Sequence, residues 1–222
     1  MAEILPAVMP ESFSDLEEKM KLMEGLVSMV QVDVMDGIFV PSKSWPYNEN
    51  DRESFTQLIE KKNLFPSWEK VSFEVDLMVA NPEAVVTDWV TLGAKRIIVH
   101  SNATENMDEV IRILSGRVEI GIALHIDTPI SVIERYKKHI SVIQCMGIKN
   151  PGYQREPFCE LVIPKIKEIK NAYPDIMISI DGGVNEETAP SLVSAGAERL
   201  VSGSAIFDSK NPKETILALA SL

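Results

Sequence analysis

Two short segments far apart in the sequence each end an apolar, strand-like run with a carboxylate. They are residues 31–37, QVDVMDG, and residues 180–183, IDGG. If both strands belong to one closed parallel barrel, Asp33 and Asp181 can face each other across its mouth. A pair of carboxyl groups placed in this way can move a proton, one acting as the acid and the other as the base.

The alternation of side chains along a strand adds a third carboxylate to this mouth. Alternate residues of a strand point to the same face, so Gln31 and Asp33 should share the barrel interior, and the same count along residues 73–78 turns Asp76 inward. Buried carboxylates are unfavourable together unless a cation binds or a proton is shared. The other interpretation is that Asp33 and Asp181 cap loops and form turns.

Two glycine-bearing turns follow the last two predicted strands. Gly182 and Gly183 come directly after Asp181, and Gly203 and Ser204 follow the eighth strand. Glycine lets main-chain amides approach an anion closely, and a helix that begins after the turn adds the positive end of its dipole. The turns therefore favour phosphate binding, although glycine also serves simply to close tight connections.

Methionines and histidines end other predicted strands. Met35, Met78 and Met146 are expected either to pack in the core or to give a polarizable apolar lining to a flat anionic intermediate. His100 and His125 could reach the mouth, but such histidines are more often satisfied polar fillers than ligands.

The elements that would position these residues alternate from one end of the chain to the other. Apolar, β-branched runs are the strand candidates: residues 4–9, 30–35, 71–79, 95–100, 118–124, 140–146, 176–181 and 198–202. Helical spacing marks residues 82–92, 106–114, 158–172 and 185–195 between them. Eight such units predict an α/β fold, a single (β/α)8 TIM-barrel domain over residues 1–222.

An open doubly wound sheet is the alternative, but the nucleotide fingerprint G-x-G-x-x-G is missing after the first strand. We therefore expect no nucleotide cofactor. The longest irregular connection, residues 37–51, follows the second strand and suits a lid over the site; the other interpretation is a surface insertion packed by its own aromatic side chains.

The composition excludes several classes of protein. With 222 residues, 45% hydrophobic and 25% charged, the chain resembles an ordinary globular domain. A net charge of −11 argues against a nucleic-acid partner. No apolar run is long enough for a membrane span and no leader is evident, so we expect a cytoplasmic protein. Cys145 and Cys159 lack a metal-type spacing and are expected to be reduced.

Six segments resemble those of the ribulose-phosphate 3-epimerase family. They are residues 32–37 (VDVMDG), 39–41 (FVP), 77–79 (LMV), 150–152 (NPG), 181–185 (DGGVN) and 203–207 (GSAIF). The resemblance implies a barrel of the ribulose-phosphate-binding type, a phosphorylated ketose substrate, a divalent metal, and two aspartates acting on opposite faces of the reacting carbon. Asp33 and Asp181 occupy those two positions, and Gly152 belongs with the phosphate-binding turns.

The chain departs from the family pattern at several positions. The family supplies two histidine metal ligands, for which Gln31 and Asp76 stand here, and Ile38 replaces a histidine. The predicted ligands, Gln31, Asp33, Asp76 and Asp181, offer only oxygen, which favours Mg²⁺, Mn²⁺ or Ca²⁺ over Zn²⁺. The family's glycine-rich continuation is also altered, and Arg155 could substitute a guanidinium in the phosphate grip.

The sequence predicts an isomerase that epimerises a ketose phosphate at the carbon next to the ketone through an enediolate, with activity weakened or redirected by these changes. Two alternatives stay open: a sugar-phosphate aldolase or lyase on the same scaffold, and a non-catalytic barrel that binds a phosphometabolite. A homo-oligomer is compatible with the sequence.

Overall fold

Eight parallel strands form a closed barrel in the order of the sequence, as the computed structural model shows for residues 2–49, 51–60, 65–67, 69–153 and 155–222. The strands are β1 (Glu3–Val8), β2 (Met29–Met35), β3 (Ser72–Met78), β4 (Arg96–His100), β5 (Glu119–Leu124), β6 (Val142–Met146), β7 (Met177–Asp181) and β8 (Arg199–Ser202). Every predicted strand has its counterpart, with ends within two residues. The (β/α)8 fold is confirmed.

Helices follow most strands. They are α1 (Phe13–Met23), α2 (Arg52–Glu60), α3 (Val86–Thr91), α4 (Met107–Leu114), α5 (Val162–Ala172), α6 (Ala189–Ala195), α7 (Ser204–Phe207) and α8 (Pro212–Ala220), with short 3-10 turns at Pro82–Ala84 and Ile130–Ile133. Among the described residues, no helix combines the length and apolar character that a membrane crossing requires.

Helices α5 and α6 begin later than the sequence predicts. For α6 the cause is a hydrogen-bonded turn just before the helix. The Asn185 Oδ1 atom accepts hydrogen bonds from the amides of Glu187 (2.9 Å) and Thr188 (3.0 Å). This side-chain turn competes with helix formation, so the helix expected from residue 185 begins at Ala189. The helix expected from residue 158 begins at Val162.

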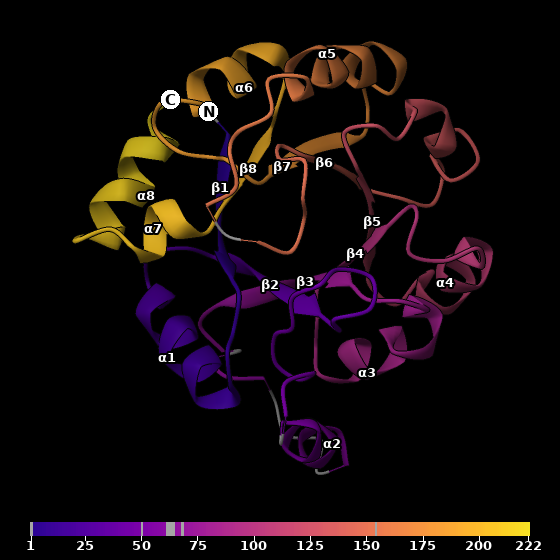
Figure 1. Cartoon of the computed structure of the whole chain (residues 1–222), viewed down its shortest axis with the longest axis vertical. Coiled ribbons are helices and arrows are strands. Elements are labelled where there is room, and N and C mark those ends of the chain that lie inside the picture. Colours follow the sequence, from indigo (N-terminus) through magenta and orange to yellow (C-terminus); the bar gives the residue numbers. More distant parts are fainter. Residues whose placement is uncertain (1, 50, 61–64, 68, 154) are drawn as a thin grey trace. The chain divides into compact units, whose positions relative to one another are not determined.

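By its internal contacts the chain groups into two compact units, Val8–Ile120 and Met1–Ala7 with Gly121–Leu222. The single domain over residues 1–222 therefore stays a prediction. Within the first unit, β2 pairs with β3 and β3 with β4, and α3 and α4 lie side by side outside these strands (Figure 1). Within the second, β6, β7, β8 and β1 pair in succession, and α5 and α6 are neighbours (Figure 1).

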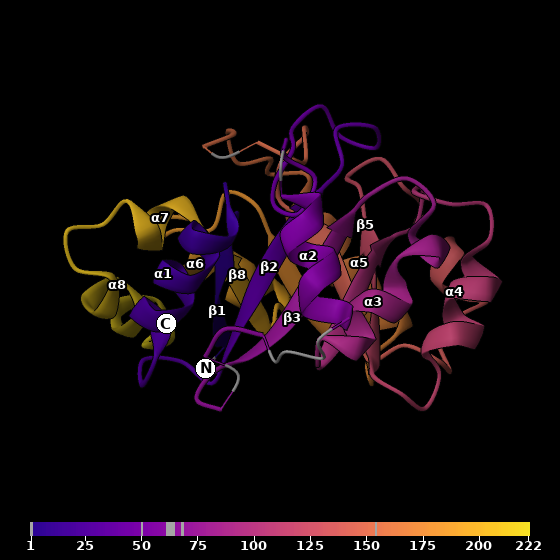
Figure 2. The same cartoon turned by 90° about the horizontal axis from the view of Figure 1, so that it is seen from below.

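The segment after β2 is held by an aromatic cluster rather than standing free. Trp45 is fully buried, and its ring lies 5.4–6.3 Å from the rings of Phe55, Phe65 and Trp89 and 5.5 Å from that of Phe13. The segment rises beyond the carboxyl end of β2 in the side view of Figure 2. The expectation of a surface insertion packed by its own aromatic side chains is therefore wrong for Trp45, because the ring partners given above all come from outside residues 37–51.

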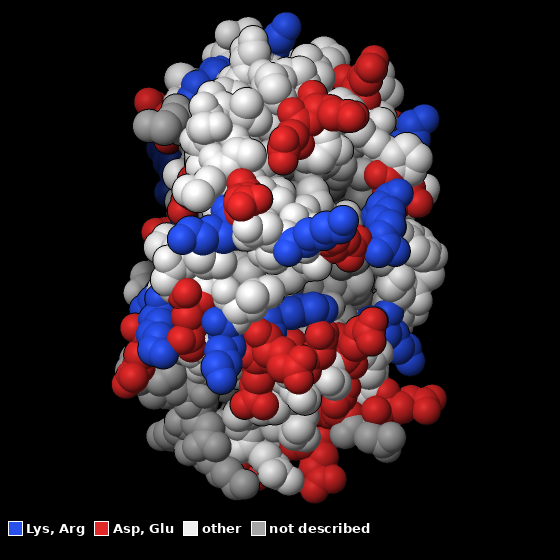
Figure 3. Space-filling view, turned by 90° about the vertical axis from the view of Figure 1, so that its left-hand side faces the viewer, with Lys and Arg blue, Asp and Glu red and all other residues white. Residues whose placement is uncertain are grey.

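Charged side chains fill the amino-terminal ends of several strands. Arg96 on β4, 5% exposed, pairs with Glu74 on β3 and Glu119 on β5. Arg199 on β8 pairs with Glu3 on β1 at 2.6 Å. These pairs satisfy inward-facing charges that would otherwise be costly to bury. On the outer surface, acidic and basic side chains intermingle on the face drawn in Figure 3.

Candidate functional site

Strand β2 carries Asp33, which is 7% exposed and held from two directions. The amide Nε2 of Gln31, two residues earlier on the same face, donates to Asp33 Oδ1 at 2.9 Å. The backbone oxygen of Asp33 accepts a bond from Ser44 Oγ at 2.8 Å. The side chain and the main chain of this aspartate are therefore both restrained before any ligand binds.

Strand β3 carries Asp76 beside Asp33, in direct register on the neighbouring strand. Its side chain is fully buried, and His100 Nε2, at the end of β4, lies 3.1 Å from its Oδ1 atom. The ring of Phe39 packs against the imidazole, with ring centroids 5.2 Å apart. His100 thus behaves as a buried partner of a carboxylate, which sequence reasoning had not paired with it.

Strand β7 ends with Asp181, which is half-buried. Gln144 Nε2, on β6, donates to its Oδ2 atom at 3.3 Å, and the amide of Gly147 donates to its backbone oxygen at 2.7 Å. Gln144 was missed by sequence reasoning. The signal was available, because Gln144 precedes Met146 by two residues and so shares its face of the strand.

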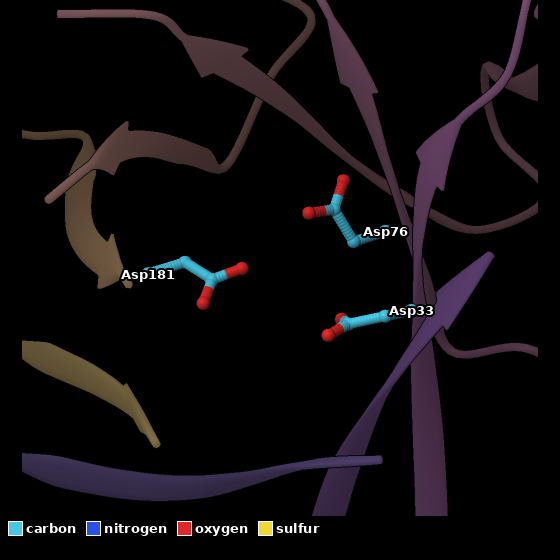
Figure 4. A group of neighbouring side chains, drawn as sticks. All are labelled: Asp33, Asp76 and Asp181. Atoms are coloured by element: carbon cyan, nitrogen blue, oxygen red, sulfur yellow. The ribbon is translucent and has the colours of Figure 1, made fainter. Parts of the chain in front are cut away.

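One carboxylate oxygen from each of Asp33, Asp76 and Asp181 lies within 4.8 Å of the others (Figure 4). A set of oxygen donors this close together, largely buried, suits a hard divalent cation such as Mg²⁺, Mn²⁺ or Ca²⁺. Gln31, the fourth predicted ligand, has its amide nitrogen rather than its oxygen directed at Asp33. The donor set formed by the three aspartates therefore fits the implied metal by its chemistry.

Met35 and Met78 form an apolar cluster with Val40, against which Met9 and Phe39 pack. Both methionines are nearly inaccessible, as is Met146 on β6, which lies in register with Asp181. Their burial agrees with core packing at the strand ends.

The loop after β2, which borders this cluster, is fixed by Asp36, a buried aspartate in addition to Asp33 and Asp76. Asp36 accepts hydrogen bonds from the amides of Ile38 and Phe39 through Oδ1 and from the amide of Ala80 through Oδ2, at 2.8–2.9 Å. It ties the loop after β2 to the loop after β3. Ile38 itself is 78% exposed, so the residue in place of the family's histidine points toward solvent.

The glycine turns bring backbone segments into close approach. Gly182 has a φ of +97°, and a Cβ atom there would come within 2.7 Å of the Ile148 side chain. A Cβ atom on Gly147 would meet the Gly182 carbonyl oxygen at 2.2 Å. Only glycine allows this packing of the β6 and β7 turns.

The other predicted phosphate ligands lie in two different settings. Gly152 and Gly183 have φ values of +92° and +69°, and Gly203 precedes Ser204, the first residue of α7. The carbonyl of Gly203 accepts the amides of Ile206 and Phe207. Phosphate binding at these turns stays a prediction.

Arg155 has an acidic partner that the sequence did not suggest. Its guanidinium donates to Asp208 Oδ2 through Nε at 3.1 Å and Nη2 at 2.8 Å. The arginine side chain is 72% exposed, and Asp208 directly follows α7. The ion pair thus links the turn after β6 to the end of α7.

The two cysteines are not bridged, and both are buried. Burial raises the pKa of Cys145 to about 12, so its thiol is protonated at neutral pH. Both cysteines are therefore free thiols, as expected from their spacing.

Comparison with known sequences and structures gives a consistent result. The profile of the family described as "Ribulose-phosphate 3 epimerase family" matches residues 3–207. Ribulose-phosphate 3-epimerase of Bacillus subtilis is 30% identical over 97% of both chains, and that of Chlamydia muridarum is 31% identical over 97% of this chain and 93% of its own. A crystal structure titled KGPDC from Streptococcus mutans is similar in fold, with a TM-score of 0.67 and 15% identity over 100% of this chain and 96% of that one.

Proposed function

Because the chain belongs to the ribulose-phosphate 3-epimerase family, we propose that it is an isomerase that inverts the carbon next to the ketone of a phosphorylated ketose, with ribulose 5-phosphate as the first candidate substrate. The observation that carries the proposal is the group formed by Asp33, Asp76 and Asp181, in which two carboxylates of the family pattern lie close enough to act on one small molecule.

The proposed reaction is a proton transfer on two faces of one carbon. One of Asp33 and Asp181 starts ionised and removes the proton next to the ketone, which leaves an enediolate. The other starts protonated and delivers a proton to the opposite face. The direction of the reaction decides which aspartate takes which role, and the pair titrates as a coupled unit.

The glutamine amides support these roles. Gln31 donates to Asp33 and Gln144 donates to Asp181, so each carboxylate is oriented by a neutral donor that does not itself exchange a proton in the reaction. Orienting the acid and the base before the substrate binds lowers the barrier, because less reorganisation is needed in the transition state.

Asp33, Asp76 and Asp181 would hold a divalent cation, and Gln31 would join them only by turning its amide oxygen inward and giving up its hydrogen bond to Asp33. When bound, such a cation supplies electrostatic stabilisation to the developing negative charge on the substrate oxygens. The oxygen-only donor set favours Mg²⁺, Mn²⁺ or Ca²⁺, and the third negative charge offsets part of that stabilisation.

The remaining predicted residues bind the substrate in this proposal. Met35, Met78 and Met146 supply an apolar wall for the flat enediolate, which disfavours loss of the intermediate to water. The phosphate-binding residues are Gly152, Gly182, Gly183, Gly203 and Ser204, whose turns offer main-chain amides. Arg155 joins them if its guanidinium leaves Asp208 for the phosphate, which a guanidinium can bind through two parallel hydrogen bonds.

The test is incubation with ribulose 5-phosphate and Mn²⁺ in deuterated water. We expect the epimer to form and deuterium to enter at the third carbon, and we expect Asp181→Asn to abolish both while Asp175→Asn, an exposed aspartate just before β7, does not. Wild-type protein that yields neither epimer nor deuterium would reject this substrate assignment.

The same experiment separates the two alternatives. Cleavage or extension of the carbon skeleton, with a panel of ketose phosphates, would indicate an aldolase or lyase. A phosphosugar that raises the melting temperature but is not converted with any divalent metal would indicate a binding protein. The observation that favours a binding protein is the replacement of the family's two histidines by Gln31 and Asp76.

A further inference from the structure

We propose that His100 is a positioning residue for Asp76, and that through Asp76 it sets the affinity of the site for a divalent cation. The inference rests on the proposed function, because it assumes that Asp76 is a metal ligand. It concerns a pairing particular to this chain, since Asp76 stands where the family resemblance implies a histidine.

The contact between the two residues is short and buried. His100 Nε2 lies 3.1 Å from Asp76 Oδ1, and the side chains of the two residues are 1% and 0% exposed. The two atoms are in direct polar contact, outside the geometry of a well-formed hydrogen bond. In a site with little water to compete, such a contact restricts the rotation of the carboxylate.

The imidazole is itself held in place. Phe39 packs against it, with centroids 5.2 Å apart and the ring planes inclined at 55°. Asp36 accepts the amide of Phe39 and, with its other oxygen, the amide of Ala80 just beyond β3. The order of contacts from Asp36 through Phe39 and His100 to Asp76 therefore runs across β2, β3 and β4.

His100 lies outside the group of mutually close ligand atoms, which consists of Asp33, Asp76 and Asp181. In many metal sites a histidine binds the ion and a carboxylate orients that histidine from behind. Here the two residue types have exchanged places, so that the carboxylate faces the cluster and the imidazole stands behind it. In other metalloproteins, mutation of the residue that orients a metal ligand weakens metal binding about 10–100-fold.

The experiment measures Mn²⁺ binding by electron paramagnetic resonance without substrate. His100→Phe keeps a planar ring beside Phe39 but removes the nitrogen, whereas His100→Gln keeps a polar nitrogen close to the position of Nε2. His139→Asn, at an exposed histidine, is the control. We expect His100→Phe to raise the Kd for Mn²⁺ by about 10–100-fold and the other two variants to change it by less than about threefold.

A second measurement uses the unaltered protein and so does not depend on the folding of a variant. In a spectrum of protein with ¹⁵N-labelled histidines, Mg²⁺ should shift the ring signals of His100 and leave those of His139 in place. An unchanged His100 signal with Mg²⁺ bound, or wild-type Mn²⁺ affinity in a folded His100→Phe protein, would overturn the inference.

The outcomes also separate this inference from the proposed function. Metal binding that depends on His100 in a protein without epimerase turnover would sustain the inference and reject the function. Turnover together with metal binding insensitive to His100 would do the opposite. A wild-type protein that binds no Mn²⁺ would overturn the inference and the assigned metal together.

Discussion

A glutamine amide accompanies each proposed catalytic aspartate, and this pairing defines the site at the scale of single residues. Gln31 Nε2 lies 2.9 Å from Asp33 Oδ1, and Gln144 Nε2 lies 3.3 Å from Asp181 Oδ2. Both glutamines are fully buried. A neutral amide can orient a carboxylate without adding charge, whereas the imidazole implied by the family resemblance at position 31 would offer a ligand nitrogen.

The oxygen-only donor set leads to a prediction about metal preference. In the double variant Gln31→His/Asp76→His we expect the ratio of Zn²⁺ to Mn²⁺ affinity to rise at least about tenfold, because imidazole nitrogen suits Zn²⁺ and carboxylate oxygen suits Mn²⁺. Competition titration with a zinc chelator measures it. Asp76→Asn is the control, since it removes the charge without adding nitrogen; an unchanged ratio in the double variant would contradict the assigned ligands.

Strand alternation located Asp33 and Asp76 well, because residues in register on paired strands share a face. It could not pair His100 with Asp76, or Arg155 with Asp208, because each pair joins residues from different βα units. Such contacts depend on how far one strand or turn is displaced from the next. The periodicity of a single segment carries no information on that displacement.

At the scale of elements, the segment after β2 is anchored at Ser44. This side chain is 1% exposed, accepts the amide of Met35 at 3.0 Å and donates to the carbonyl of Asp33 at 2.8 Å. The single hydroxyl therefore joins the loop to the last residues of β2, the strand that carries Asp33. The segment is therefore held both by the hydrogen bonds of Ser44 and by the aromatic packing around Trp45.

Ser44→Ala should lower the free energy of unfolding by about 1–3 kcal/mol, because it leaves a buried amide and carbonyl without this partner. Urea unfolding followed by circular dichroism measures the loss. Ser42→Ala, at a half-buried serine in the same segment, is expected to change stability by less than about 0.5 kcal/mol. Equal effects of the two substitutions would show that the Ser44 hydroxyl is not an anchor.

Helix α5 is joined to the turn after β5 by a buried lysine. Lys165 Nζ donates to the backbone oxygens of His125 (2.6 Å), Ile126 (3.1 Å) and Thr128 (2.5 Å), beside a cavity of about 370 Å³. Burial lowers the pKa of Lys165, and the three carbonyls offset that cost for the charged form. His125 Nε2 in turn lies 2.8 Å from the carbonyl oxygen of Lys149, so the link extends to the turn after β6.

Lys165→Met should therefore destabilise the protein by about 2–4 kcal/mol, since three carbonyls lose a charged donor while the aliphatic stem is retained. It should also raise the KM for a phosphorylated substrate, because the turn that carries Gly152 loses its support. Lys167→Met, on the exposed face of the same helix, is the matched control. Thermal melting and steady-state kinetics of both variants give the comparison, and similar values for the two would refute the link.

At the scale of the whole molecule, closure of the barrel explains why the strands could be found from the sequence. The outward face of each strand packs against the surrounding helices and must be apolar. A β-branched run therefore recurs once in each strand–helix repeat of the sequence. The helices were less well defined, because their starts depend on local capping. Asn185, for example, holds the turn that delays α6 by its own hydrogen bonds.

Closure also depends on the pairing of β1 with β8, in which Glu3 lies opposite Arg199 and Leu5 opposite Val201. Removal of residues 1–8 would leave the edge of β8 unpaired and would take away buried apolar side chains of β1. We expect the shortened protein to lose its cooperative thermal transition and to be recovered largely as aggregate. Removal of Ser221 and Leu222, which are exposed, should change neither property. Circular dichroism melting and soluble yield measure the two effects, and a cooperative melt of the protein without residues 1–8 would show that β1 is dispensable for closing the barrel.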